Sequence, residues 1–102
     1  MYKKYALTEN KITNANGDDL YQIIALREVG MVKAGSYGGF IQSESNLAHE
    51  GDAWVYDNAQ VYDNAQVYGN ARVYGNARVY GNARVYGNAW VYGNAWVYDN
   101  AH

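Results

Sequence analysis

The sequence of 102 residues contains no cysteine, no proline and only one phenylalanine. Without cysteine, disulfides and every cysteine-ligated metal site are excluded. Ten acidic against eight basic residues give a formal net charge of −2, so no strong positive field draws the chain onto nucleic acid or a membrane surface. No apolar run has the length of a signal peptide or membrane span. We therefore expect a soluble, cytoplasmic protein that has no cofactor and no membrane partner, with nucleic acid disfavoured as a ligand.

Tyrosine is the residue in excess, with 12 copies, and eight of them belong to one repeat. Residues 55–102 are eight hexads: VYDNAQ twice, VYGNAR three times, VYGNAW twice and VYDNAH once. A period of six fits no helical face, and Gly and Asn in every hexad would break a helix repeatedly. Each hexad instead reads as a short strand with Val and Ala inward, followed by a corner at Gly-Asn, where positive φ is tolerated. Because every corner turns the same way, the chain is predicted to coil.

An aliphatic residue with a small residue four places on, as in Val73 and Ala77, makes the chain resemble the hexapeptide-repeat proteins. The resemblance implies an all-β fold: a left-handed triangular β-helix with three hexads per coil, an exception to the usual right-handed crossover. Upstream, VKAG (32–35), GGFI (38–41), NLAHEG (46–51) and AWVY (53–56) are similar to the N-terminal segment of uncharacterised, often prophage-borne bacterial members, some labelled acyltransferases. The similarity covers roughly residues 5–102. It implies a phage or prophage origin and a place in the cytoplasm of a bacterial or phage-infected cell.

Before the repeats, residues 5–8 and 20–27 read as strands around a segment rich in turn formers, which predicts a β-hairpin. We divide the single domain into an N-terminal hairpin cap (1–30), a degenerate first coil (31–54) and eight regular repeats (55–102). Counting back in sixes from the repeats places Ile41, Leu47 and Ala53 on the small inward position.

A solenoid needs a cap because its terminal strands leave backbone groups unpaired. The repeat runs to Ala101 and His102 without a second cap. We therefore expect self-association through the uncapped C-terminal coil or through the faces, with a two-fold dimer favoured. A trimer, which the family resemblance implies, is the alternative.

Side chains 18 residues apart should stack about 4.8 Å above each other. One outward column then reads Trp54, Arg72, Trp90, which would place a guanidinium between two indoles and allow cation–π attraction. Two interpretations are open: the columns only stabilise neighbouring coils, or they form a binding face for a second copy or a host protein. The expected binding surface comprises Trp54, Arg72, Trp90, Arg78, Trp96, Arg84, Tyr74 and Tyr92.

Enzymatic function has one candidate residue. The family contains acyltransferases that use a histidine base, and carbonic anhydrases that hold a metal with three histidines; this sequence has His49 and His102. Two histidines do not complete the metal site. His49, next to Glu50, is a candidate general base, but no inserted loop interrupts the repeats to cover a substrate. We predict a non-enzymatic scaffold or protein-interaction module, and keep two alternatives: a small acyltransferase-like enzyme, and a phage-encoded inhibitor that binds a host protein.

Overall fold

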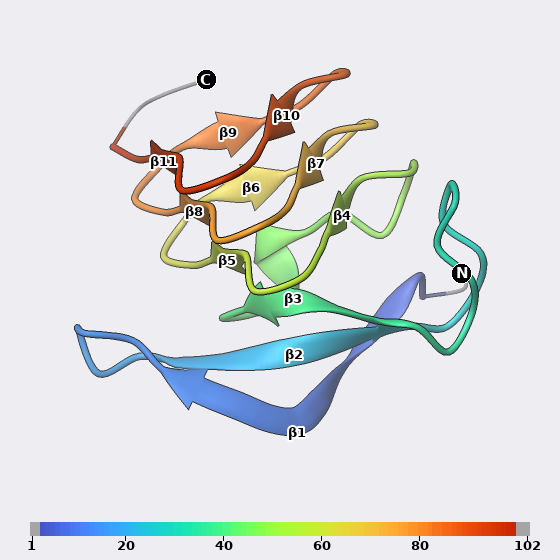
Figure 1. Cartoon of the computed structure of the whole chain (residues 1–102), viewed down its shortest axis with the longest axis horizontal. Helices are drawn as coiled ribbons and strands as arrows, with labels where there is room; N and C mark the ends of the chain where they lie inside the picture. Colours follow the sequence, from blue (N-terminus) through green and yellow to red (C-terminus); the bar gives the residue numbers. More distant parts are fainter. Residues whose placement is uncertain (1–2, 100–102) are drawn as a thin grey trace.

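The computed structural model describes residues 3–99 and shows a β-solenoid preceded by a long hairpin (Figure 1). Within these residues there is no α-helix, which confirms the all-β prediction. The sense of the coil stays a prediction. The elements are β1 (Tyr5–Thr13), β2 (Asp19–Ala25), β3 (Tyr37–Ile41), the 3-10 turn η1 (Glu44–Asn46), β4 (Trp54–Val55), β5 (Gln60–Val61), β6 (Gln66–Val67), β7 (Arg72–Val73), β8 (Arg78–Val79), β9 (Arg84–Val85), β10 (Trp90–Val91) and β11 (Trp96–Val97).

The coils stack in register at the predicted spacing of 18 residues. Trp54 pairs with Arg72, and Arg72 with Trp90, in the parallel sheet β4-β7-β10. The other faces are the pair β6-β9 and the series β5-β8-β11, which belongs to a six-stranded sheet. Backbone N–H groups of one coil donate to carbonyls of the next coil along the chain; the Trp54 N–H, for example, lies 3.1 Å from the Ala71 oxygen.

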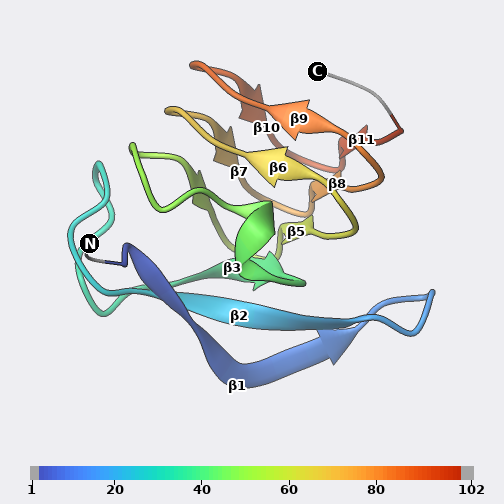
Figure 2. The same ribbon diagram turned by 180° about the vertical axis from the view of Figure 1, so that it is seen from behind.

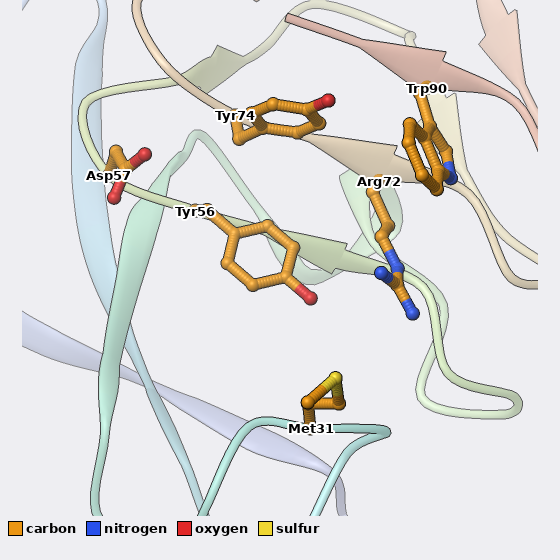
Figure 3. Close-up of a pocket in the computed structure, with 6 residues that line it drawn as sticks. All are labelled: Met31, Tyr56, Asp57, Arg72, Tyr74 and Trp90. Atoms are coloured by element: carbon orange, nitrogen blue, oxygen red, sulfur yellow. The ribbon is translucent and has the colours of Figure 1, made fainter.

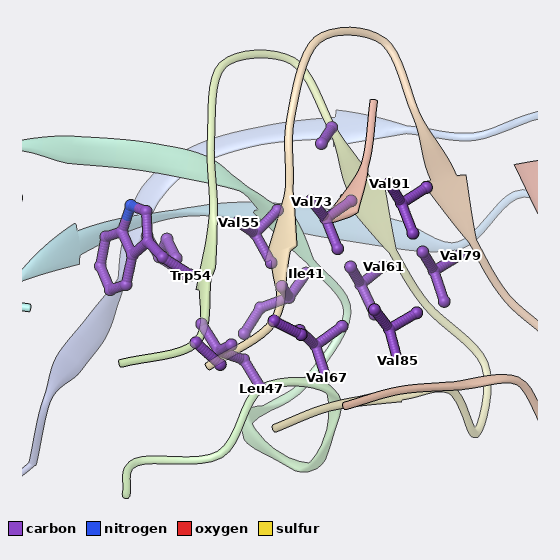
Figure 4. Packing of buried hydrophobic residues seen from close by; sticks show 14 of the residues in the cluster. Ile41, Leu47, Trp54, Val55, Val61, Val67, Val73, Val79, Val85 and Val91 are labelled. Carbon is purple, nitrogen blue, oxygen red and sulfur yellow. The ribbon is translucent and has the colours of Figure 1, made fainter. Parts of the chain in front are cut away.

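The core is the predicted column of small and β-branched side chains. The repeat valines from 55 to 91 are buried, and the repeat alanines from 53 to 83 have no exposed surface (Figure 4). Their corners turn through left-handed residues: Gly69 has φ of 70°. Asp57, Asp63 and Asp99 adopt the same region with φ between 56° and 58° where they replace that glycine, which a short polar side chain tolerates.

The hairpin lies against the N-terminal side of the solenoid (Figures 1 and 2). Strand β2 pairs antiparallel with β3, and β3 pairs parallel with β5, so one sheet runs from the hairpin into the coils. The expected strand limits were wrong at two places. Strand β1 continues to Thr13 because it pairs with β2 on both sides of a bulge, and β2 ends at Ala25, after which Leu26 donates its N–H to the Lys4 carbonyl.

The first coil contains two residues more than the regular coils. Ile41 pairs with Val61 and Leu47 with Val67, both 20 residues on, whereas Val55 pairs with Val73, 18 residues on. Ile41 and Leu47 are thus buried on the aliphatic position, and the prediction that they occupy the small one was wrong; Ala53 lies where expected. The Ala48 N–H donates to the Val67 carbonyl and the Asp52 N–H donates to the Gly69 carbonyl, so the two additional residues lie between Ala48 and Asp52. The extra residues are therefore in the corner that contains His49.

Candidate binding surface

Trp54, one of the expected surface residues, is fully buried. The Tyr5 ring of β1 packs edge-on against the indole, with centroids 6.3 Å apart and planes at 78°. Trp54 does occupy the outward column, in register with Arg72. Because the N-terminal strand covers this part of the column, the placement of Trp54 on a binding surface was wrong.

The exposed tryptophans lie on the later coils, Trp90 in the column of Arg72 and Trp96 in the column of Arg78 on the neighbouring face. Trp90 and Trp96 are each 58% exposed, and the guanidinium carbons of Arg72 and Arg78 lie 5.8 and 5.5 Å from their respective ring centroids. This distance suits a cation–π interaction. Arg72 thus stacks with one indole rather than lying between two. Arg84, on β9, is exposed on the third face, where no tryptophan follows it.

Tyrosines form a ladder of ring contacts beside each of these columns, stacked except for the edge-on pair Tyr56–Tyr74. Tyr74 and Tyr92 lie 5.4 Å apart with planes at 14°, and Tyr92 is 58% exposed. Tyr74 also meets Trp90 edge-on at 6.5 Å. Such contacts between neighbouring coils are worth about 0.5–1.5 kcal/mol each, so the columns do stabilise the solenoid, yet their outer edges remain open to solvent.

One face of this surface is hollowed. The Arg72 hollow, about 300 Å³ in volume, is lined by Met31, Tyr56, Asp57, Arg72, Tyr74 and Trp90. Figure 3 shows Arg72, the Tyr56 hydroxyl and Met31 facing the same space, with Trp90 above the guanidinium. Tyr56 precedes Tyr74 by 18 residues, so the repeat spacing predicts its place next to Tyr74. The place of Met31 is not predicted, because no local pattern says where a single exposed methionine on an irregular loop will lie.

The Arg72 hollow contains one positive side chain, Arg72, and one negative side chain, Asp57. The ion pairs within residues 3–99 are Lys3–Glu44 and Lys11–Asp19, and Glu44 also accepts a hydrogen bond from His49; none of these contacts uses a repeat arginine. Burial raises the pKa of the Tyr56 hydroxyl, and the positive charge of Arg72 opposes that shift. The Tyr56 hydroxyl therefore stays protonated and is a hydrogen-bond donor at neutral pH.

His49, the candidate base, is engaged at both ring nitrogens. Its Nδ1 accepts the Lys4 N–H at 3.1 Å, so the ring proton is on Nε2, which lies 2.8 Å from the Glu44 carboxylate. The ring stacks on Tyr5 with centroids 4.2 Å apart. The hydrogen bond from His49, followed by Lys3, lowers the pKa of Glu44. No lone pair of the ring is left to take a proton from a substrate.

The same region satisfies carbonyl groups of the first coil. The Lys4 Nζ donates to the Ala53 oxygen at 2.6 Å, and the Tyr5 hydroxyl donates to the Leu47 oxygen at 2.6 Å. In the next coil the equivalent carbonyl of Ala71 accepts a backbone N–H from the preceding coil. The side chains of Lys4 and Tyr5 are both fully buried. Burial lowers the pKa of Lys4 to about 8, helped by the positive charge of Arg27, and burial raises the pKa of Tyr5.

Residues 3–99 contain neither a cluster of metal-ligating side chains nor a membrane-spanning helix. No group of three histidine, cysteine, aspartate or glutamate side chains there could hold a metal ion. No helix of the described chain has the length and apolarity to cross a membrane. His102 lies outside the described residues.

Fold and repeat together define a β-solenoid repeat protein. Residues 65–80 and 77–93 match the family model described as the YdcK beta solenoid repeat. A curated relative, the uncharacterized acetyltransferase YdcK of Escherichia coli (strain K12), is 39% identical over 62 residues. The match covers 54% of this chain but only 19% of the relative. The comparisons thus support the predicted hexapeptide-type solenoid, while the prophage origin stays a prediction.

Proposed function

We propose that this chain is a non-enzymatic β-solenoid module that binds a protein partner through its exposed Trp–Arg–Tyr columns. The observation that carries the proposal is the pair of half-exposed indoles, Trp90 and Trp96, each stacked with an arginine that has no acidic partner in the described chain. Aromatic and arginine side chains dominate the binding energy of protein interfaces. The setting that we propose is the cytoplasm of a bacterial or phage-infected cell, and the Escherichia coli relative supports the bacterial part of it.

The partner in the simplest form of the proposal is a second copy of the chain, in a two-fold dimer. A host protein that the module blocks is the other form. Both use the same columns, so one double variant tests both. Trp90→Ala with Trp96→Ala removes the exposed indoles and leaves the valine core untouched. Tyr37→Ala, an exposed aromatic residue on β3, is the matched control.

The experiment combines two measurements. Light scattering across a concentration range gives the mass of the wild type and each variant, and immobilised protein gives the set of bacterial proteins retained. We expect the double variant, but not the control, to lose self-association or a specific retained protein. A wild type that is monomeric at every concentration and retains nothing in excess of the double variant would refute the proposal.

An enzymatic role is the competing proposal, since the relative is named an acetyltransferase. Against it stands the geometry of His49, whose Nδ1 and Nε2 are both hydrogen-bonded. The discriminating assay is transfer of an acetyl group from acetyl-coenzyme A to a panel of amines and hydroxyls, with wild type and His49→Gln. Turnover that His49→Gln abolishes would replace the scaffold proposal with the enzymatic one.

A further inference from the structure

The Arg72–Trp90 pair that lines the hollow has a counterpart six residues on, the Arg78–Trp96 pair. Each pair lies beside two tyrosines at equivalent positions of adjacent hexads, but Tyr56 and Tyr74 meet edge-on at 86°, whereas Tyr62 and Tyr80 stack at 3°. The distances agree: Arg72 to Trp90 is 5.8 Å and Arg78 to Trp96 is 5.5 Å. Met31, however, lines only the hollow at Arg72 among the described cavities. The repeat therefore supplies a built-in comparison between a site with the methionine and one without it.

Met31 is held at this wall by a tightly bonded turn. The Val29 N–H donates to the Val32 carbonyl at 2.9 Å, and the Val32 N–H returns the bond at 2.8 Å. Both valines are buried, whereas Met31 between them is 87% exposed. An anchored turn thus displays a flexible apolar side chain beside the hollow and leaves it uncovered. Methionine in that setting adapts to the shape of a ligand.

The polar groups of the hollow select the charge of the ligand. Arg72 packs one face on Trp90, and a stacked guanidinium keeps its N–H edges free for bidentate bonds to a carboxylate. The Tyr56 hydroxyl faces the same space (Figure 3). A volume of about 300 Å³ is at the lower end for small-ligand sites, so it accepts roughly one large side chain and its neighbour.

We infer that the Arg72 hollow binds a peptide segment in which an acidic side chain adjoins an aromatic one, the carboxylate on Arg72 and the ring between Trp90 and Met31. The inference deepens the proposed function and rests on it. Two observations on charge argue for this partner: the Arg72 guanidinium forms no salt bridge within residues 3–99 and can take one carboxylate, and Asp57 in the same wall disfavours ligands with many negative charges. A nucleic-acid strand would bring several phosphates to a chain of net charge −2, and it would place them near Asp57 in the hollow wall.

The test follows the three indole N–H signals by NMR during titration with the probe peptide acetyl-Glu-Phe-Glu-amide. Trp90 and Trp96 are equally exposed and Trp54 is buried, so the protein contains its own positive and negative references. We expect a saturable shift at Trp90 and none at Trp96 or Trp54. Single tryptophan-to-phenylalanine variants assign the three signals.

Variants then separate charge from packing. Arg72→Ala should weaken binding about tenfold or more, as expected for a lost charge-assisted bond, while Lys11→Ala, at an exposed position on β1 outside the hollow, should change it less than about twofold. Met31→Ala should weaken binding about threefold, and Met31→Leu should restore most of the loss. The uncharged peptide acetyl-Gln-Phe-Gln-amide should bind at least about tenfold more weakly than the probe.

Three outcomes would overturn the inference: equal shifts at Trp96, no saturable shift at millimolar probe, or saturation by oligothymidylate instead of peptide. These failures are distinguishable from failure of the proposed function. If the Trp90→Ala and Trp96→Ala double variant still abolishes self-association or partner retention, only the ligand class assigned to the Arg72 hollow is wrong. If that variant changes nothing either, the proposed function fails as well.

Discussion

The buried ammonium group of Lys4 predicts that the protein becomes more stable as the pH rises above neutral. Burial lowers the pKa of Lys4 from 10.5 to about 8, with Arg27 adding to the effect and Asp52 opposing it. Between these two values the unfolded chain binds more protons than the folded chain. The free energy of unfolding must therefore increase with pH in that window. The neutral amine still donates to the Ala53 carbonyl, so the contact survives deprotonation.

The magnitude follows from the linkage relation. One pKa unit corresponds to about 1.4 kcal/mol, and integration from about pH 7 to about pH 10 gives a gain of about 2 kcal/mol. The raised pKa values of Tyr5, Tyr56 and Tyr62 act in the opposite direction above their unfolded value of 10.0, because those hydroxyls must stay protonated in the folded state. The measurement therefore ends near pH 10.

Urea denaturation at several pH values between these limits gives the free energy of unfolding of wild type and Lys4→Met. Methionine preserves the apolar stem and removes the titrating group, so we expect the variant to lose most of the slope, whatever its stability at neutral pH. Lys33→Met, at an exposed position, should keep the wild-type slope. Equal slopes for wild type and Lys4→Met would refute the assignment of a buried ammonium group.

Three further substitutions test the packing, each by urea denaturation. Tyr5→Phe removes a hydroxyl that donates to a first-coil carbonyl at 2.6 Å and should cost about 1–3 kcal/mol, whereas the exposed Tyr92→Phe should stay within about 0.5 kcal/mol. Gly69→Ala should lower the free energy of unfolding more than Gly87→Ala. Both glycines have positive φ, but of the two only Gly69 would bring a Cβ within 2.9 Å of the backbone of another coil. Gly87→Ala should therefore show only the conformational cost of about 1–2 kcal/mol. Val79→Ala, in the fully buried valine column, should lower the free energy of unfolding by about 2 kcal/mol. Equal stabilities of wild type and Tyr5→Phe, of the two glycine variants, or of wild type and Val79→Ala would contradict the corresponding contact.

The repeats were predictable from sequence because every determinant is local. A valine, an alanine four places on and a corner glycine or asparagine recur in phase. One hexad therefore determines the strand, the inward face and the turn, and the same structure repeats in every hexad. The confirmed pairing of Trp54 with Arg72 and Arg72 with Trp90 needs nothing beyond that period. Exposed indoles at Trp90 and Trp96 follow from the same argument.

The first coil was less predictable because its determinants lie far apart in sequence. Counting in sixes missed the two-residue enlargement near His49, since a corner insertion leaves the flanking pattern intact and shifts only its phase. The enlarged corner is held by residues more than 40 positions away: the Lys4 N–H bonds the His49 ring, and the Lys4 Nζ bonds the Ala53 carbonyl. No local pattern in the N-terminal segment indicates these bonds.

Trp54 and Trp90 show how this distant segment decides the location of the candidate site. They occupy the same column, on either side of Arg72, yet Trp54 is fully buried and Trp90 is 58% exposed. The difference comes from β1, which lays Tyr5 against Trp54, and from the turn that brings Met31 to the Arg72 hollow. The repeat places both tryptophans in one column, and the N-terminal segment makes Trp54 part of the core and Trp90 part of a lined surface. A binding site on this solenoid is therefore specified jointly, by the hexad for its chemistry and by the irregular segment for its position.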